Sequence, residues 1–266
     1  MITSFNTNNK MVMTSEMKNE SIFQVLEFDD LKGSGDFNLS IQIDYMKRSS
    51  VKLRQIRLIL EDSAIKIETG SISYMKGNIE IEAETTEGIK GFGKRFFFSK
   101  ATKEPMFKSI IKGTGEVFLE ASFDYFTLIE LQDEEIIVDD GLFYACEEGV
   151  EIENTMQKDE GKPQIKLSGS GIVVLKIPVP EKEILRCKIF RDTLKLDGDF
   201  AILRSANIDF TMGKPGTAFN GEGFLNIYRG TGEIWLTPTK IVYDKLKEKG
   251  IKESKAMDLD YEEEGE

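Results

Sequence analysis

Residues that could bind a charged ligand gather in one Gly-rich stretch, Gly88–Lys103, which reads GIKGFGKRFFFSKATK. Lysines and an arginine are interleaved there with phenylalanines, and the glycines would let the backbone adapt to a bound surface. Such a stretch suits an acidic protein partner, a phosphate-bearing ligand or an anionic membrane surface. It is also typical of a connector whose phenylalanines pack into the core. The candidate ligand or partner site consists of Lys90, Phe92, Lys94, Arg95, Phe96 and Phe97.

Paired carboxylates are the other residues that could do chemistry. Two of them converging in a cleft could act as an acid and a base or hold a metal ion. Each pair lies beside a predicted turn, where acidic side chains commonly cap the backbone or face water. We therefore assign no catalytic residue and no metal site to them. The pairs are Asp139 with Asp140, Glu147 with Glu148, and Asp197 with Asp199.

The chain contains no histidine. This absence excludes Ser-His-Asp and Cys-His catalysis in their usual forms, and also zinc or iron sites with histidine ligands. Its two cysteines, Cys146 and Cys187, each lie in an apolar, strand-like stretch and are too few for a disulfide framework or a zinc site. We expect reduced core thiols, no cofactor and no enzymatic activity.

The formal net charge of −12 disfavours a nucleic-acid partner, because binding to phosphates requires clustered Lys and Arg. The N-terminal stretch lacks the apolar core of a signal peptide. No apolar run reaches the roughly 18 residues of a membrane span. We therefore expect a cytoplasmic protein, which could touch a membrane surface but is not predicted to do so.

One phrase, a Gly-x-Gly flanked by alternating apolar residues, recurs along the chain and indicates repeated β units. We interpret each Gly-x-Gly as a hairpin turn, since glycine supplies the positive φ that such turns need. No predicted helix follows these glycines, so they do not indicate a nucleotide-binding loop. The copies are IIKGTGEVFL from Ile110, IKLSGSGIVVL from Ile165 and the closing GEGFLNIYRGTGEIWLTPT from Gly221.

A second phrase aligns without a gap in three copies, which start at Ile65, Ile136 and Leu194. Each copy reads as a short strand, an acidic turn with glycine, a second strand, a polar turn and a third strand. The copies predict an all-β fold of three repeated β-sandwich units with a short C-terminal charged helix. The predicted units are residues 21–87, 104–160 and 161–239, with the link at residues 88–103 between the first two.

The two ends of the chain differ from this repeated pattern. Residues 1–20 are polar and predict a flexible lead, and a first strand is expected at Ser21–Phe28. The cleanest alternation in the chain, from Phe37 to Tyr45, predicts a half-buried strand with one wet face. Residues 240–266 predict a charged helix, at Val242–Met257, followed by an acidic tail.

Three segments together resemble a known family: YMKGNIEIE at Tyr74–Glu82, GIKGFGKRFF at Gly88–Phe97, and the closing hairpin phrase. Their order and spacing are similar to those of the family named for altered inheritance of mitochondria, member twenty-four, formerly a bacterial domain of unknown function. Thr231 stands where that family usually has Pro, and Phe224-Leu225 where it has Leu-Val. The resemblance runs from about Val51 to Pro238.

The resemblance implies a fold like that of the tryptophan RNA-binding attenuation protein. Three sandwiches resembling double-stranded β-helices would then pack about a pseudo-threefold axis. The resemblance supplies no catalytic residues to carry over. RNA binding would follow from fold analogy alone, which is a weak argument because one fold hosts many functions, and the negative charge disfavours it.

We expect a non-catalytic β scaffold or protein-interaction module. It would self-associate through exposed sheet edges or sandwich faces and bind an unknown protein partner. The alternative is a small-molecule or anion-binding module, with its site at the link of residues 88–103. An enzyme is the least favoured of the three readings.

Overall fold

The computed structural model describes residues 11–33, 35–83, 108–139, 141–155, 164–213 and 225–249. The chain divides into two compact units. The first consists of Met1–Ile177 with Ser205–Asn207, and the second of Pro178–Arg204 with Ile208–Glu266. Strands dominate the described part of both units and pair antiparallel. The predicted all-β class is confirmed, together with a short helix towards the C-terminus.

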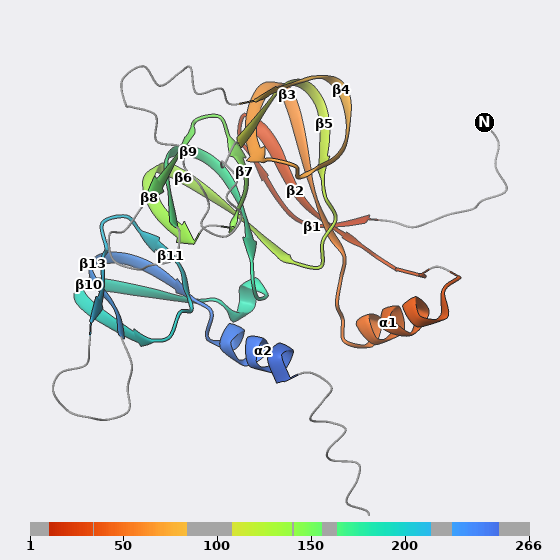
Figure 1. The fold of residues 1–266 in the computed structure, drawn as a ribbon. Coiled ribbons are helices and arrows are strands. Elements are labelled where there is room, and N and C mark those ends of the chain that lie inside the picture. The colour runs from red at the N-terminus through yellow and green to blue at the C-terminus, as the bar shows by residue number, and fades with distance from the viewer. Residues whose placement is uncertain are drawn as a thin grey trace, which may run out of the picture. The chain divides into compact units, whose positions relative to one another are not determined.

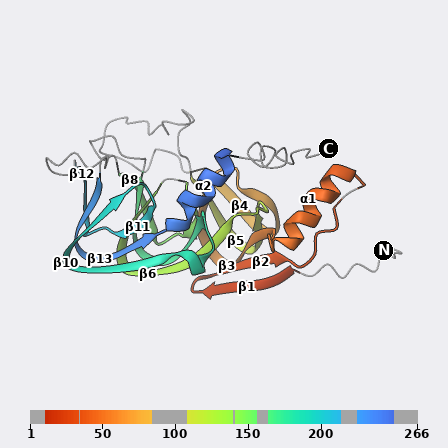
Figure 2. The same ribbon diagram turned by 90° about the horizontal axis from the view of Figure 1, so that it is seen from below.

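The first unit contains nine strands and one helix in its described part (Figure 1). They are β1 (Met11–Lys18), β2 (Ser21–Phe28), α1 (Phe37–Arg48), β3 (Arg54–Glu68), β4 (Ile72–Ala83), β5 (Lys108–Leu119), β6 (Tyr125–Asp139), β7 (Phe143–Glu147), β8 (Val150–Thr155) and β9 (Gln164–Ile177). The strand predicted at Ser21–Phe28 is confirmed as β2. Residues 11–18, predicted as part of a polar lead, form β1 and lie beside β2 in both views (Figures 1 and 2).

Long central strands organise the first unit. β3 pairs with β5 along one edge and with β2 and then β7 along the other. β9 pairs with β6, β7 and β8, so the strand that the sequence assigns to the start of the third unit has its partners in the second. Alternate residues of β3 point into the core, where Ile56, Leu58 and Leu60 are fully or almost fully buried. Each such side chain contributes about 1.5–3 kcal/mol of hydrophobic stabilisation.

The second unit contains four strands and a helix among its described residues. They are β10 (Leu185–Asp197), β11 (Ala201–Ser205), β12 (Asp209–Gly213), β13 (Leu225–Leu236) and α2 (Pro238–Lys249), preceded by a 3-10 turn at Glu181–Glu183. β13 pairs with each of the other three strands. Its residues Tyr228, Ile234 and Leu236 join a small buried cluster with Ile189 and Leu196 of β10. The helix predicted at Val242–Met257 begins earlier, at Pro238, and the described part ends at Lys249.

The Gly-x-Gly phrases are not hairpin turns, which corrects the sequence interpretation. Each lies inside one continuous strand: β5, β9 or β13. The glycines have positive φ, 129° at Gly113 and 158° at Gly115, and they let the strand cross a neighbour closely. A Cβ on Gly113 would lie 2.1 Å from the carbonyl oxygen of Asn78 in β4. Glycine is therefore required here by a bend and a close backbone approach, not by a change of direction.

Opposite each Gly-x-Gly, the partner strand carries a β-bulge. The bulge residues Asp62, Asp133 and Arg191 have φ of 55°, 58° and 48°. Each lies three residues before the start of a copy of the second phrase. In each case the backbone amide of the bulge residue donates a hydrogen bond to the hydroxyl between the two glycines. The donor and acceptor pairs, each 3.0 Å apart, are Asp62 with Thr114, Asp133 with Ser170, and Arg191 with Thr231.

The strand predicted from Phe37 to Tyr45 is wrong, because this segment forms helix α1. Asp36 caps the helix, with its Oδ1 accepting a 2.8 Å hydrogen bond from the backbone amide of Leu39. Arg48 pairs with Asp44 one turn earlier at 2.9 Å. Both of these bonds are local, and none of the described strands pairs with this segment. Apolar residues with a spacing of two cannot share one helix face, and α1 buries none of them.

Candidate functional site

The predicted ligand or partner site lies outside the described residues. Lys90, Phe92, Lys94, Arg95, Phe96 and Phe97 all belong to residues 84–107, between β4 and β5. The assignment of a charged ligand or partner to this link therefore stays a prediction. The same holds for the acidic tail, which follows α2.

Of the predicted carboxylate pairs, Asp140 lies outside the described residues, and the other members have separate surroundings. Asp139 accepts a 3.1 Å hydrogen bond from Nε2 of Gln164, while Asp197 ends β10 with an exposed side chain. Glu148 is exposed and lies 3.8 Å from Nζ of Lys112. Within the described ranges, no group of three or more Cys, Asp or Glu side chains is placed to hold a metal ion.

Glu147, predicted to be a solvated turn residue, is instead buried, which corrects that interpretation. Its Oε1 accepts a hydrogen bond from the backbone amide of Ser21 at 3.0 Å. Its Oε2 accepts bonds from the amide of Ile172 at 2.9 Å and from Nδ2 of Asn19 at 3.0 Å. Three donors compensate the desolvation of the carboxylate. Glu147 therefore ties the β1–β2 hairpin to β7 and β9 and has a structural role.

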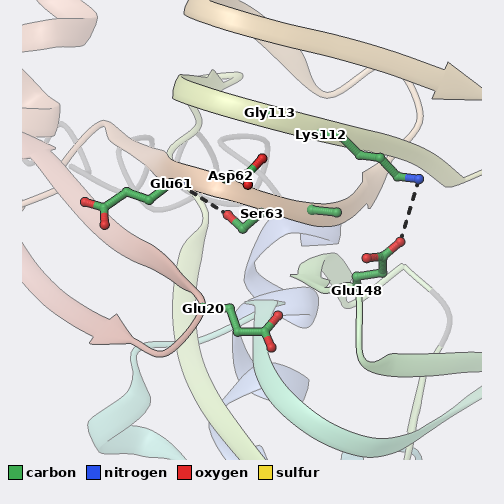
Figure 3. A pocket seen from close by; sticks show the side chains of 8 residues that line it. Glu20, Glu61, Asp62, Ser63, Lys112, Gly113 and Glu148 are labelled. Atoms are coloured by element: carbon green, nitrogen blue, oxygen red, sulfur yellow. Dashed lines mark hydrogen bonds and ion pairs between the residues drawn. The ribbon is translucent and has the colours of Figure 1, made fainter.

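A hollow of about 560 Å³ opens beside the first bulge (Figure 3). Its walls come from the β1–β2 turn, β3, β5 and the β7–β8 turn, and the lining residues are Glu20, Glu61, Asp62, Ser63, Ala64, Lys112, Gly113 and Glu148. Four carboxylates and one ammonium make it a poor site for an anion. Figure 3 shows Glu61 turned away from Lys112 and Glu148, so these side chains do not point at a common centre. This arrangement does not support general acid–base catalysis.

Strand β10 is the largest exposed edge in the second unit. Among the described residues, it pairs with β13 and with no other strand, over its whole length of 13 residues. Leu185 is 57% exposed and Phe190 is 74% exposed. Unpaired strand edges present backbone donors and acceptors to any other extended chain, so proteins usually shorten or cover them. β10 is long and partly apolar, and no strand of the described residues covers its second edge.

Cationic side chains accompany the apolar ones on β10. Arg186, Lys188, Arg191 and Lys195 are all exposed. Nε of Arg186 lies 2.6 Å from Oε1 of Glu233 on β13, and Nε1 of Trp235 donates to the same oxygen at 2.7 Å. Burial works to raise the pKa of Glu233, but the hydrogen bonds from Trp235 and Arg186 outweigh it and hold that pKa below its ordinary value.

Strand β4 is the matching exposed edge in the first unit. β5 is its one strand partner among the described residues. Tyr74 and Met75 are 48% and 40% exposed, although the Tyr74 ring stacks on Phe118 of β5 with centroids 4.4 Å apart. Sequence reasoning missed both edges as specific sites, because an edge is defined by the strands that do not pair with it.

Comparison with known proteins identifies a family and a related fold. Residues 45–239 match the family described as mitochondrial biogenesis AIM24, which confirms the predicted resemblance. No curated protein matches the chain. The chain is similar to the crystal structure of a structural-genomics target from Streptococcus pyogenes, with a TM-score of 0.53 and 18% sequence identity. That match covers 85% of this chain and 99% of the other and concerns the fold alone. Among the helices of the described residues, none is long and apolar enough to cross a membrane.

Proposed function

This chain belongs to the AIM24 family, and from that premise we propose that it is a non-catalytic β scaffold that binds other polypeptide chains along an open sheet edge. Strand β10 carries the proposal. It offers 13 residues of extended backbone with exposed Leu185 and Phe190, and it pairs on one side within the described residues. A partner strand would gain main-chain hydrogen bonds from the edge and side-chain contacts from the two apolar residues.

The charge of β10 adds selectivity to this edge. Its four exposed cations stand out on a chain with a net charge of −12. Complementary charge speeds encounter and excludes partners of the wrong sign. An extended segment that alternates apolar and acidic residues would suit β10 best, because successive side chains of a strand point to opposite faces.

The alternative function, binding of a small molecule or anion, draws no support from the described residues. The hollow beside the first bulge is rich in carboxylates, which disfavours anions. The link that contains Lys94 and Arg95 lies outside the described residues, so this alternative is tested there by changing both residues to Glu. The cytoplasmic location also stays an expectation.

The experiment that tests the scaffold function compares three purified forms as baits in a lysate of the host. The edge variant carries Leu185→Glu and Phe190→Glu. The matched control carries Leu246→Glu on α2, an exposed residue of the same unit. The unchanged protein and the Leu246 control should retain the same polypeptides, including any second copy of this chain, and the edge variant should lose them. Equal retention by all three forms would refute the proposal. Thermal unfolding of each form checks that the fold persists.

A further inference from the structure

The first unit shows how the edge of a long strand is covered in this fold. β3 carries the bulge at Asp62, and its second edge is covered by β2 and then by β7. The β7 part of this cover places Ile65 opposite Glu147, Lys66 opposite Cys146, and Ile67 opposite Ala145. β7 is buried along its whole length.

Strand β10 is the counterpart of β3 but has no such cover among the described residues. The bulge amides of Arg191 and Asp62 each donate a hydrogen bond to the hydroxyl between two glycines. Aligning these two bulge residues assigns every residue of β10 a counterpart on β3. Leu185 then corresponds to Ile56, and the two are 57% and 0% exposed. A position that is fully buried on β3 is therefore open on β10, although Ile189 and Leu196 of β10 are buried like their counterparts Leu60 and Ile67.

Strand β4 is the counterpart of β7 and is also open. The gapless alignment of the three phrases places residues 72–76 on residues 143–147. Whereas all five residues of β7 are buried, Ser73, Tyr74, Met75 and Lys76 are exposed. Within the described part of the chain, one strand of the β3 type and one strand of the β7 type thus have an edge without a partner strand.

We infer that β10 of one copy pairs with β4 of a second copy in the way that β3 pairs with β7. This inference rests on the scaffold function proposed above and names a second copy of this chain as the occupant of the β10 edge. By equivalence, Leu194 lies opposite Lys76, Lys195 opposite Met75, and Leu196 opposite Tyr74. The two strands run antiparallel, as β3 and β7 do.

The charges of the two strands favour this pairing. β10 begins with the basic residues Arg186 and Lys188, while β4 ends with the acidic residues Glu80 and Glu82, all of them exposed. An antiparallel arrangement directs the beginning of β10 towards the end of β4, beyond the three residue pairs that the β3–β7 register defines. Opposite charges on neighbouring strands stabilise pairing, and like charges disfavour it.

Such a contact joins two different surfaces, so a pair of copies keeps one open β4 and one open β10. A contact of this kind repeats until a ring closes or a filament grows. Native mass spectrometry at increasing protein concentration should therefore show dimers or larger oligomers. A monomer at every concentration would overturn the inference.

Disulfide trapping tests the register. Residues facing each other on antiparallel strands have Cα atoms about 4.5–5.5 Å apart, within the range that a disulfide spans. All variants carry Cys187→Ser, and Cys146 stays because it is buried. A protein with Lys195→Cys is mixed with one carrying Met75→Cys, and the mixture is oxidised. The expected product is a linked heterodimer. Lys195→Cys mixed with Ile81→Cys is the register control and should give little product, although Ile81 is an exposed residue of the same strand.

A chain with both Lys195→Cys and Met75→Cys completes the test. We expect a ladder of disulfide-linked multimers on a non-reducing gel. Loss of both thiols without multimers, or no linkage at all, would overturn the inference. The scaffold function would survive that outcome if the Leu185 and Phe190 variant still lost other polypeptides from the host lysate. If that variant lost nothing, the function itself would fail.

Discussion

The backbone amide of Asp62 donates a 3.0 Å hydrogen bond to the hydroxyl of Thr114, at the point where β3 bulges against the Gly-Thr-Gly of β5. Asp133 with Ser170, and Arg191 with Thr231, repeat the contact. A bulge leaves an extra residue without a ladder partner. The hydroxyl supplies an acceptor for that residue, which explains why Thr or Ser stands between the glycines in all three phrases.

Replacing the hydroxyl should therefore weaken the fold modestly. Thr231→Val keeps the shape of the side chain but removes the acceptor for the Arg191 amide. Because this amide is exposed to water, we expect a loss of about 0.5–1.5 kcal/mol in the free energy of unfolding, measured in urea. Thr231→Ser is the control and should retain most of that free energy. Equal losses in the two variants would show that the hydrogen bond is not the cause.

Gly113→Ala should destabilise the protein far more than Gly70→Ala. Both glycines have positive φ, 129° and 83°, but nothing lies within 4 Å of a Cβ built at Gly70. That variant should lose about 1 kcal/mol from its left-handed backbone alone. At Gly113 the new methyl group would collide with the Asn78 carbonyl oxygen, so we expect a loss above about 3 kcal/mol or failure to fold. Similar thermal unfolding of both variants would contradict this reading.

Glu147→Ala should be among the most damaging single changes in the first unit. It leaves the buried amides of Ser21 and Ile172 without their acceptor, at an expected cost of about 1–3 kcal/mol for each. Glu148→Ala is the matched control, since its exposed carboxylate should matter by less than about 0.5 kcal/mol. Hydrogen exchange at the Ser21 amide reports the effect locally. Unchanged protection there in the Glu147 variant would refute the role assigned to this residue.

The stability of the second unit should depend on pH through Glu233. Its folded pKa lies below its ordinary value of 4.5, so on acidification the unfolded chain binds the proton first. The contribution of Glu233 is present above pH 4.5 and is lost as the pH falls through the folded pKa. Glu233→Gln should therefore unfold with a shallower dependence of stability on pH in that window. An identical slope in the variant and the unchanged protein would exclude this contribution.

How far the sequence predicts the fold is clearest at the Gly-x-Gly phrases. Their alternating apolar flanks correctly indicated β-strands, but their role as hairpin turns was wrong. Positive φ at glycine is compatible with a turn and with a bend inside a strand. Whether the glycines form a turn or a bend depends on the bulge in the partner strand, β3, β6 or β10. The bulge residue Asp62 is 52 residues away in sequence from its hydroxyl partner Thr114. A local pattern does not contain that information.

Helix α1 shows the opposite failure. The alternation from Phe37 to Tyr45 is typical of a strand that buries one face. The cap at Asp36 and the Asp44–Arg48 pair are local helix signals at its two ends. They decide the structure here, since none of the described strands buries the apolar residues. The alternation shows which apolar side chains a strand would bury. It does not show whether a partner strand is present to form that strand.

The candidate edges lie between these two cases. The three aligned phrases already pair β10 with β3 and β4 with β7 as equivalent strands. Exposure of Phe190 could not be inferred from them, because burial depends on which strands pair from elsewhere in the chain. The signal available in the sequence was an apolar residue, Phe190, among the cationic residues Arg186, Lys188 and Arg191.

The hydrogen bonds that Glu147 accepts from Asn19 and Ser21 have a practical consequence for any shortened form of this protein. The family match begins at residue 45, after the β1–β2 hairpin, so a protein trimmed to the matched segment would lose Asn19 and Ser21. The buried carboxylate of Glu147 would then lose two of its three hydrogen-bond donors. The edge of β3 from Arg54 to Leu60, which β2 covers in the full chain, would be exposed. Such a truncated protein should precipitate during expression, although every residue that defines the family is present.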